Sequence, residues 1–549
     1  MSKPIYREQL KQIREAFPSP RSDRLHDAYF VFSIMRALDQ VDDMKSEVPL
    51  LGTVGHLDYV AAESERIADA PSTVEDVTRE LVKTLEGMPI WGHPRTQINV
   101  VPPPTIPGIV GTLLASIYNP NLVSDDTSQA VELAEHRAAA MTAALIGYDP
   151  SKSTGVFTFG GTGTTLYGVR IGIEKAIPES LRNGVGSNAV IIASGQSHYA
   201  RLNVAGWLGL GEKNVISVPT DLTNAIRVEV FTTEARRAIE SGRRIAAIIV
   251  TMGTTDAFGI DDLAAIVEVR DRLVEEYELD YCPHIHADAV IGWAWSVFNA
   301  YDFDENPLGF RPRTVRALAD AGRRISKLCL ADSVGIDFHK TGFTPYISSL
   351  FLVRNRADME LLVRGRDEMP YLFQTGERHP GIFTLETSRS GAGALAALAN
   401  LMLFGRRGLQ VILGHLVEMA ELLREHFEGH RHTTVLNSDN VGTVTLFRVY
   451  PDDVDTWTIK DREQTDPSSR DELLAHNEYN RRVFHYLHEQ AMEGKGVRIS
   501  MTDCYRHTSY GEPIVALKSY MLSPFIDEDD VECLVAIVLE AREHIESVR

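Results

Sequence analysis

Cysteine is scarce in this chain, with only Cys282, Cys329, Cys504 and Cys533 among 549 residues. Their scatter predicts no disulfide framework, and no CxxC or Cys/His spacing typical of zinc is present, so no metal is expected. The sequence also has no uninterrupted apolar run of about 18 residues and no apolar core of a signal peptide near its first residue. We therefore expect a cytoplasmic protein with no membrane partner.

Basic residues are outnumbered, because 55 Lys and Arg stand against 76 Asp and Glu, which gives a formal charge of −21. This charge argues against a general nucleic-acid binder, which needs a basic surface for phosphates. Hydrophobic residues make up 44% and charged residues 24%, as is typical of globular proteins. The length allows three or four domains, or one large catalytic domain with extensions.

The first part of the chain is mostly polar with helical periodicity. Apolar residues recur with helical spacing over 73–85, and Thr73 is suited to cap that helix. Proline and glycine are frequent over 86–121, which predicts a loop-rich crossing. A longer helix is expected over 128–146, where Gly147 is suited to end it.

From about residue 155, short β-rich runs alternate with amphipathic helical stretches. This alternation predicts a mainly parallel sheet covered by helices on both faces, with ligands beyond the carboxyl ends of the strands. Residues 364–384 are predicted to form a mobile loop, and the charged stretch 451–475 a surface insertion. The expected strands are 156–159, 189–193, 215–218, 245–251, 284–288 and 333–338.

A glycine-rich segment, FGGTGTT at residues 159–165, lies between an expected strand and an expected helix. Small residues let backbone N–H groups approach an anion at a helix amino terminus, so a phosphate site is one interpretation. An ordinary tight turn is the other. The segment matches neither GxxxxGK[ST] nor GxGxxG, which disfavours nucleoside-triphosphate and dinucleotide binding.

Two further strand ends carry residues suited to chemistry. Asp288 ends an apolar strand, where a carboxylate is costly unless a partner such as a cationic ring nitrogen pairs with it; a surface carboxylate is the alternative. Lys340 follows another strand and can form a Schiff base with a carbonyl cofactor, although a structural lysine is the alternative. A metal at His284 and His286 is disfavoured, because no third ligand pattern accompanies them. A phosphate turn, an aspartate and a lysine in this order are the parts needed for pyridoxal phosphate.

These motifs resemble the group II pyridoxal-phosphate-dependent amino-acid decarboxylases. GGT at 160–162, SHY at 197–199, GTT at 253–255, HADA at 286–289 and HK at 339–340 follow the order of that family. The resemblance runs from about residue 85 to 430. It implies an α/β fold of type I, the aspartate-aminotransferase-like fold, with a mainly parallel seven-stranded sheet. It also implies a homodimer whose site lies near the subunit boundary.

The same resemblance implies a division of the chain and the roles of residues. An amino-terminal helical and loop segment over 1–121, at the dimer interface, would precede a large cofactor domain over 122–404. A small α+β domain over 405–549 would follow. Lys340 would hold the cofactor as an aldimine, and Asp288 would keep the ring nitrogen protonated so that a quinonoid intermediate forms. The implied cofactor-binding residues are Gly161, Thr162, His198, Thr254, Thr255, Asp288, His339 and Lys340.

Within the family, WGH at 91–93, NPN at 119–121 and KTGFTPY at 340–346 resemble segments of bacterial tyrosine decarboxylases. By this resemblance His93 and Tyr346 contact the substrate, and Tyr346 or Tyr371 returns a proton to its Cα. A loop hydrogen bond for His93 and packing below the cofactor for Tyr346 are the alternatives. Arg389, in an SR pair, belongs either to the scaffold or to the edge of the site.

The expected reaction is decarboxylation of an L-amino acid, with a tyrosine-like aromatic side chain favoured, to an amine and carbon dioxide. The chain departs from its relatives at GTT 163–165, where many have Glu-Ala-Asn, and at Ala200, Asn203 and Val290. These departures leave open an acidic or other substrate, and oxidative deamination to an aldehyde. A non-catalytic relative of the fold and a nicotinamide enzyme are the remaining alternatives.

Overall fold

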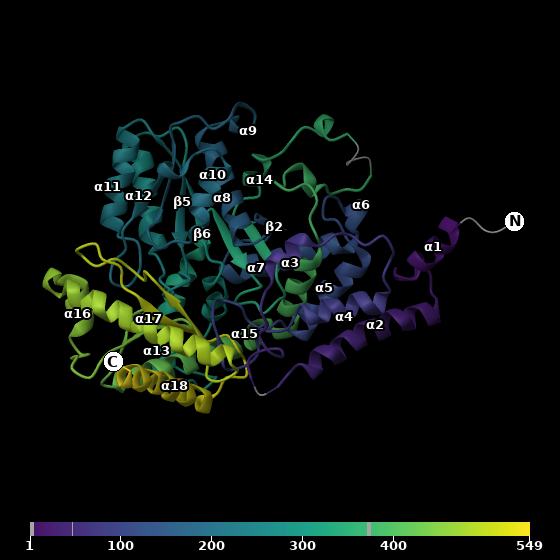
Figure 1. Cartoon of the computed structure of the whole chain (residues 1–549). Coiled ribbons are helices and arrows are strands. Elements are labelled where there is room, and N and C mark those ends of the chain that lie inside the picture. Colours follow the sequence, from purple (N-terminus) through teal and green to yellow (C-terminus); the bar gives the residue numbers. More distant parts are fainter. Residues whose placement is uncertain (1–4, 47, 371–374, 549) are drawn as a thin grey trace.

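Two β-sheets organise the chain, a seven-stranded sheet in its middle and a five-stranded sheet built mainly from its carboxy-terminal part (Figure 1). The computed structural model describes residues 5–46, 48–370 and 375–548. The strands are β1 Thr96–Gln97, β2 Thr154–Thr158, β3 Ala189–Ser194, β4 Val215–Val218, β5 Arg244–Thr251, β6 His284–Asp288, β7 Ser333–Asp337, β8 Ser349–Val353, β9 Thr433–Val435, β10 Val444–Val449, β11 Arg498–Thr502 and β12 Ala516–Tyr520.

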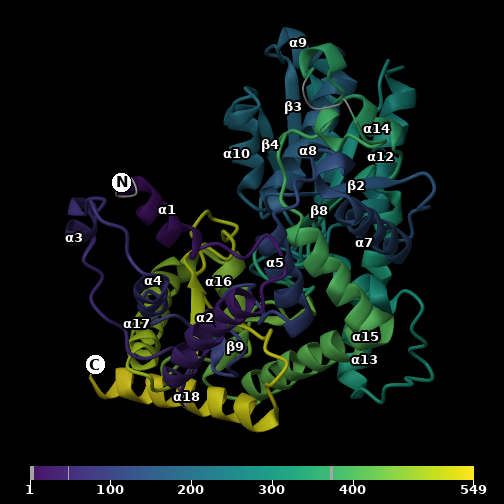
Figure 2. The same cartoon turned by 90° about the vertical axis from the view of Figure 1, so that its right-hand side faces the viewer.

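Helices cover the sheets and also form the amino-terminal segment. In both views, its helices α1 and α2 lie on the side of the molecule away from α12 (Figures 1 and 2). No helix within the described ranges is both long and apolar enough to cross a membrane. The helices are α1 Ile5–Arg14, α2 Arg24–Asp43, α3 Tyr59–Ser64, α4 Val74–Lys83, α5 Ile106–Tyr118, α6 Asp125–Ser128, α7 Ala130–Ile146, α8 Gly161–Ala176, α9 Ser180–Asn183, α10 Ala200–Trp207, α11 Val228–Glu240, α12 Leu263–Glu276, α13 Pro312–Ile325, α14 Ala357–Glu360, α15 Ala392–Gly429, α16 Ile459–Thr465, α17 Arg470–Met492 and α18 Glu528–Ser547.

The seven-stranded sheet has the order β2-β8-β7-β6-β5-β3-β4. Neighbouring strands are parallel from β7 to β4, whereas β8 runs antiparallel to both β2 and β7. The expected mainly parallel seven-stranded sheet is therefore confirmed. The parallel strands all direct their carboxyl ends to one edge of the sheet, and this edge carries the candidate site.

Alternate residues of the central strands pack against different helices. Val190 and Ile192 of β3 belong to the core beneath α11 and α12, whereas Ile191 and Ala193 pack with α8 and α10. Because side chains alternate along a strand, this division shows that helices cover both faces of the sheet. A sheet buried on both faces has near-continuous apolar strands, which explains why the sequence located β3 to β7 within one or two residues.

A buried ion pair closes the outer edge of β2. Glu135 accepts a hydrogen bond from the backbone N–H of Phe157 at 2.8 Å, and Arg389 donates to the Phe157 carbonyl at 3.0 Å. Arg389 also binds Glu135 at 2.5 Å and the Leu122 carbonyl at 2.9 Å, with side-chain exposures of 3% for Arg389 and 1% for Glu135. Arg389 therefore belongs to the scaffold, where it satisfies polar groups that an edge strand leaves unpaired.

The proline-rich stretch over 86–121 contains a regular helix, which differs from the predicted loop-rich crossing. Thr105 caps α5 by accepting a hydrogen bond from Gly108, and Pro107 lies in the first turn. Proline is tolerated there because the N–H groups of the first turn have no partner within the helix. The same stretch supplies β1, which pairs in parallel with β11 and completes the five-stranded sheet β1-β11-β12-β10-β9.

One kinked helix joins the two sheets. α15 runs through the boundary predicted at 404/405, and Gly405 has a φ of 53° at the kink.

The stretch 451–475, predicted to be a surface insertion, includes α16, and its residues Ile459 and Glu463 are buried. The Glu463 carboxylate binds the His476 ring at 2.7 Å, so part of this stretch packs inside the carboxy-terminal unit. The division into three domains stays a prediction.

We expect Arg389→Met to lower the stability of the apoprotein by about 3–5 kcal/mol, because it leaves the buried Glu135 carboxylate without its cation. The measurement is the midpoint of urea unfolding. Arg237→Met is the matched control, since Arg237 forms an exposed ion pair with Glu234 and should cost under about 1 kcal/mol. An equal cost for both variants would show that the buried pair does not support the edge.

Candidate active site

Three charged side chains meet at the carboxyl ends of β6 and β7. Asp288 ends β6, Asp337 ends β7, and the Lys340 amine lies 3.1 Å from the Asp337 carboxylate. Burial acts to lower the pKa of Lys340, but the carboxylates of Asp337 and Asp288 outweigh it and raise this pKa above its ordinary value. Lys340 is therefore held as a cation against two buried carboxylates.

The Asp288 carboxylate is 7% exposed, and its Oδ1 has no hydrogen-bond partner among the described residues. Burial raises the pKa of Asp288 to about 6, and Lys340 opposes this shift. An orphaned carboxylate oxygen at the end of a buried strand is satisfied by a cationic N–H donor. The protonated ring nitrogen of pyridoxal phosphate is such a donor, so this residue fits that cofactor.

Asp337 is a member of the cluster to which the sequence motifs assigned no role. Its carboxylate accepts a hydrogen bond from the Ser349 hydroxyl at 2.5 Å and lies 3.5 Å from Nε2 of His339. A Cβ atom placed on Gly161 would lie 3.0 Å from the Asp337 carboxylate, so this group borders the first residue of α8. The signal that could have found it is a carboxylate ending an apolar strand three residues before Lys340.

The glycine-rich turn precedes α8 and leaves its amino terminus without a side-chain cap. Gly160 has a φ of +111°, a backbone conformation that suits glycine, and an added Cβ there would meet no atom within 4 Å. By contrast, the Asp262 side chain caps α12. Uncapped N–H groups and the helix dipole favour an anion, so the turn at Gly161 and Thr162 fits a phosphate.

Two histidines and a tyrosine lie near Lys340. His198 is half-buried; burial lowers its pKa and the Lys340 charge lowers it further, which keeps the ring neutral. The buried His339 ring packs against the Tyr346 ring at a centroid distance of 4.0 Å. Burial raises the pKa of Tyr346 and Lys340 opposes this shift, so the phenol stays protonated at neutral pH. Tyr346 is 56% exposed.

The GTT segment forms a loop after β5. The Thr254 hydroxyl accepts a hydrogen bond from Gly259 at 2.8 Å, and the Asp261 carboxylate accepts from the backbone of Thr251 at 2.7 Å. These bonds fix the loop. Thr254 and Thr255 then line, together with His198, a cavity of about 1120 Å³.

The remaining predicted residues lie elsewhere or are not described. His93 lies in the turn over 90–95, where its Nδ1 accepts a hydrogen bond from the Arg95 N–H at 3.1 Å. Burial raises the pKa of Asp530 at the start of α18, and the His93 ring opposes this shift, so these two residues are neighbours. The substrate role of His93 stays a prediction, and Tyr371 lies outside the described residues. Within those residues, no group of three or more His, Cys, Asp or Glu side chains is arranged to hold a metal.

The model of the family described as "Pyridoxal-dependent decarboxylase conserved domain" matches residues 58–449. The chain belongs to this family. An L-2,4-diaminobutyrate decarboxylase of Rhizobium meliloti (strain 1021) is 26% identical over 384 residues, which are 69% of this chain and 70% of that protein. An L-tyrosine decarboxylase of Enterococcus faecium is 25% identical over 308 residues, which are 52% of this chain and 47% of that protein. The crystal structure of Oryza sativa TDC with PLP and tryptamine has a TM-score of 0.75 and 17% identity, covering 96% of this chain and 100% of that one.

These matches confirm the resemblance to group II decarboxylases and the type I fold. The protein is a pyridoxal-phosphate-dependent carboxy-lyase that acts on an amino acid. The match with the diaminobutyrate decarboxylase extends over more of the chain than the match with the tyrosine decarboxylase, so similarity alone does not select an aromatic substrate.

We expect Lys340→Ala to abolish both the visible absorbance of bound pyridoxal phosphate and the covalent adduct that borohydride traps. The reason is that Lys340 is the amine at the cluster of buried carboxylates. Mass spectrometry of the reduced protein should locate the adduct on the peptide that contains Lys340. Lys327→Ala, in the short 3-10 helix that follows α13, serves as the control and should keep both signals. A reducible adduct in Lys340→Ala would overturn the assignment.

Proposed function

We propose that the protein decarboxylates an aromatic, tyrosine-like L-amino acid to the corresponding amine and carbon dioxide. The observation that carries the decarboxylase assignment to these residues is the unpartnered Oδ1 of the buried Asp288 carboxylate, which is close enough to Lys340 to raise the pKa of that amine. When bound, pyridoxal phosphate supplies an electron sink for the electron pair that departing carbon dioxide leaves behind.

In this proposal, the cluster residues bind and orient the cofactor. Asp288 would keep the ring nitrogen protonated, and the Lys340 amine would hold the cofactor at its aldehyde carbon. The backbone N–H groups of Gly161 and Thr162, together with the His339 ring, hold the phosphate.

Other residues contact the ring and the substrate. The neutral His198 ring would stack on the cofactor, and Thr254 and Thr255, which line the same cavity, would border it. The Tyr346 hydroxyl returns a proton to the substrate Cα, for which its protonated state at neutral pH is suited. A contact of His93 with the substrate side chain is supported only by the resemblance of the segment WGH at 91–93.

Exposed aromatic side chains next to residues of the candidate site support an aromatic substrate. We call Phe159, Tyr199 and Tyr346 the aromatic rim; they are 43%, 65% and 56% exposed. Phe159 precedes the glycine turn, Tyr199 packs on the His198 ring at 4.0 Å, and Tyr346 packs on His339. Aromatic rings pair favourably with one another, by about 0.5–1.5 kcal/mol beyond the area that they bury.

The charges of the neighbouring cavity argue against a second ammonium group on the substrate. Arg201, Arg227 and Arg506 line the cavity, against Asp221 and Asp256. This excess of positive charge opposes a dicationic amino acid such as diaminobutyrate and favours a neutral or anionic side chain. An acidic amino acid is therefore the second candidate.

We expect L-tyrosine to give the highest kcat/KM in a panel with L-phenylalanine, L-tryptophan, L-glutamate, L-aspartate and L-2,4-diaminobutyrate. Carbon dioxide, amine, aldehyde and oxygen consumption are measured together for each amino acid. An amine formed without oxygen uptake is the expected result, whereas aldehyde with oxygen uptake would identify oxidative deamination. Faster turnover of diaminobutyrate than of every aromatic would contradict the substrate proposal.

Tyr346→Phe should lower amine formation by about 10²-fold, because the variant keeps the ring on His339 and loses the proton donor. Tyr199→Phe is the matched control, since it removes a hydroxyl from the other side of the rim. Normal amine formation by Tyr346→Phe would remove Tyr346 from the proton transfer.

We also propose that the chain forms a homodimer through its amino-terminal helices. α2 has no buried residue, and its Phe32, Met35 and Leu38 are 56%, 56% and 62% exposed. α5 likewise exposes Ile106 and Tyr118, by 78% and 79%. Apolar side chains exposed in groups are typical of a protein interface, and a second copy of this chain would cover both helices.

Sedimentation is expected to give twice the 61.0 kDa of one chain. Phe32→Glu together with Leu38→Glu should shift the protein toward the monomer, because charge replaces buried apolar area at the interface. Leu57→Glu, 68% exposed outside these helices, is the control and should leave the mass unchanged. A fully active 61.0 kDa species at every concentration would contradict the dimer.

A further inference from the structure

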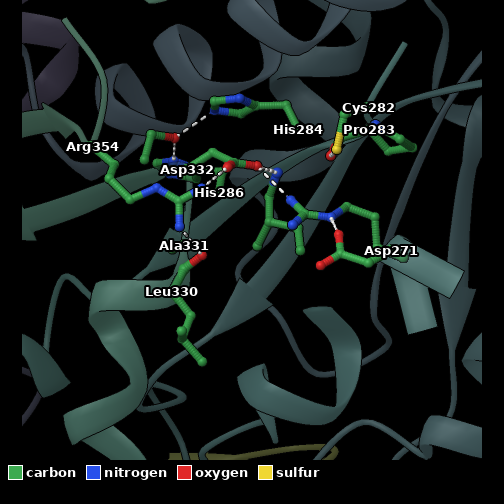
Figure 3. Close-up of polar contacts among 12 residues, drawn as sticks. Asp271, Cys282, Pro283, His284, His286, Leu330, Ala331, Asp332 and Arg354 are labelled. Atoms are coloured by element: carbon green, nitrogen blue, oxygen red, sulfur yellow. Dashed lines mark hydrogen bonds and ion pairs between the residues drawn. The ribbon is translucent and has the colours of Figure 1, made fainter. Parts of the chain in front are cut away.

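A buried polar cluster lies at the beginning of β6 and β7, at the opposite ends of these strands from Asp288 and Lys340. Figure 3 shows His284 and His286 there, with Asp332 and Arg354 nearby. Asp332 binds Arg354 and Arg270, each at 2.8 Å, and accepts from the Ile285 N–H at 2.9 Å, so its charge is satisfied. The two histidines are fully buried and have no carboxylate partner among these contacts.

Helix α8 has glycines where the two histidines lie. A Cβ atom on Gly168 would lie 2.5 Å from Nδ1 of His286, and one on Gly172 would lie 3.1 Å from Cβ of His284. Residues two apart on a strand share a face, so His284, His286 and Asp288 all point toward α8. The histidines and the catalytic carboxylate therefore form one row beneath a single helix.

Hydrogen bonds connect this row to an ion pair at its outer end. Lys175 lies 2.7 Å from the Asp358 carboxylate and 3.2 Å from Nδ1 of His284. The Ser333 hydroxyl lies 2.8 Å from Nε2 of His284 and 2.9 Å from Nδ1 of His286. We call this series, Lys175–His284–Ser333–His286, the histidine chain.

The ammonium group of Lys175 fixes the direction of every bond in the histidine chain, because it can only donate. Nδ1 of His284 accepts a hydrogen bond from this group, so the neutral His284 ring carries its hydrogen on Nε2 and donates to Ser333. Ser333 then donates to Nδ1 of His286, which leaves the hydrogen of His286 on Nε2. Both rings are neutral, because burial lowers the pKa of His286 to about 3, and burial with the Lys175 charge lowers that of His284.

The free end of the histidine chain lies beside Gly335, the residue of β7 that is paired with Asp288. His286 pairs with Ser333 across the strands, and Asp288 pairs with Gly335. The His286 ring binds Ser333 through Nδ1, and its Nε2 would lie 3.4 Å from a Cβ on Gly335, so the ring leans along the strand toward the Asp288 level. Among the described residues, Nε2 of His286 and Oδ1 of Asp288 both lack a hydrogen-bond partner.

We propose that Lys175, His284 and Ser333 are positioning residues that hold His286 as an Nε2–H donor directed toward Asp288. A fixed N–H dipole at this level favours the ionised carboxylate over the neutral acid. This dipole and the Lys340 charge both lower the pKa of Asp288, whereas the Asp337 carboxylate raises it. The inference rests on the proposed role of Asp288 as partner of the cofactor ring nitrogen, and its consequence is tighter retention of pyridoxal phosphate.

The test compares Lys175→Met, Lys175→Arg and Ser333→Ala in the full-length protein. Lys175→Met removes the obligate donor at the partly exposed end of the histidine chain, whereas Lys175→Arg preserves a cationic donor there. Ser333→Ala removes the hydroxyl that connects the two histidines. Lys152→Met, which removes an exposed lysine paired with Asp149, is the control. Histidine tautomers are read from imidazole ¹⁵N shifts in the apoprotein and assigned with His286→Gln, and the Kd of pyridoxal phosphate is measured by titration.

We expect wild type and Lys175→Arg to show His286 protonated on Nε2. Lys175→Met and Ser333→Ala should populate the Nδ1–H tautomer, raise the Kd of pyridoxal phosphate about tenfold, and lower kcat more than they raise KM. Unchanged tautomers or an unchanged Kd in a folded Lys175→Met protein would overturn the inference. If wild type decarboxylates no amino acid of the panel, the proposed function fails, while the tautomers and the cofactor Kd still decide this inference.

Discussion

The charge balance between Lys340 and the two buried carboxylates at the ends of β6 and β7 governs the candidate site. Removing any one of these groups from water alone would cost several kcal/mol, so the three are stable only as a set. Their closeness follows from sheet order, because β6 and β7 are neighbours and Lys340 comes three residues after β7. The adjacent α8 begins with Gly161 against Asp337, which places the glycine-rich turn beside these three groups. The folding of the sheet therefore assembles the charged centre without a separate loop rearrangement.

Most of the central sheet was predictable because burial on both faces gives its strands a simple apolar pattern. β8 was not predicted, since a five-residue apolar run such as Ser349–Val353 looks the same whether it forms a strand or part of a buried helix, and nothing local reveals that it runs antiparallel. The helix α5 was missed because proline suggested a break, whereas Pro107 lies in the first turn, where it is tolerated.

The sequence motifs brought together Lys340, Asp288, His339 and Tyr346, because strand ends converge at one edge of a parallel sheet. Asp337 ends a predicted strand and could have been noticed from the sequence, whereas its hydrogen bond from Ser349 belongs to a strand that had not been predicted. The order of the histidine chain was also beyond the sequence, because it depends on which glycines of α8 lie over β6. Residues matched to a motif are thus predictable, whereas partners supplied by tertiary packing are not.

The two-residue strand β1 shows how tightly the amino-terminal segment is integrated with the rest. It pairs with β11, and Gln97 accepts a hydrogen bond from Ser519 at 2.6 Å across the small sheet. A fragment that began after Gln97 would retain every strand of the seven-stranded sheet, yet it would leave the backbone of β11 exposed along one side. Such an open strand recruits other chains and promotes aggregation. The pairing of β1 with Arg498 and Ile499 of β11 therefore limits how far the chain can be shortened from its amino-terminal side for expression.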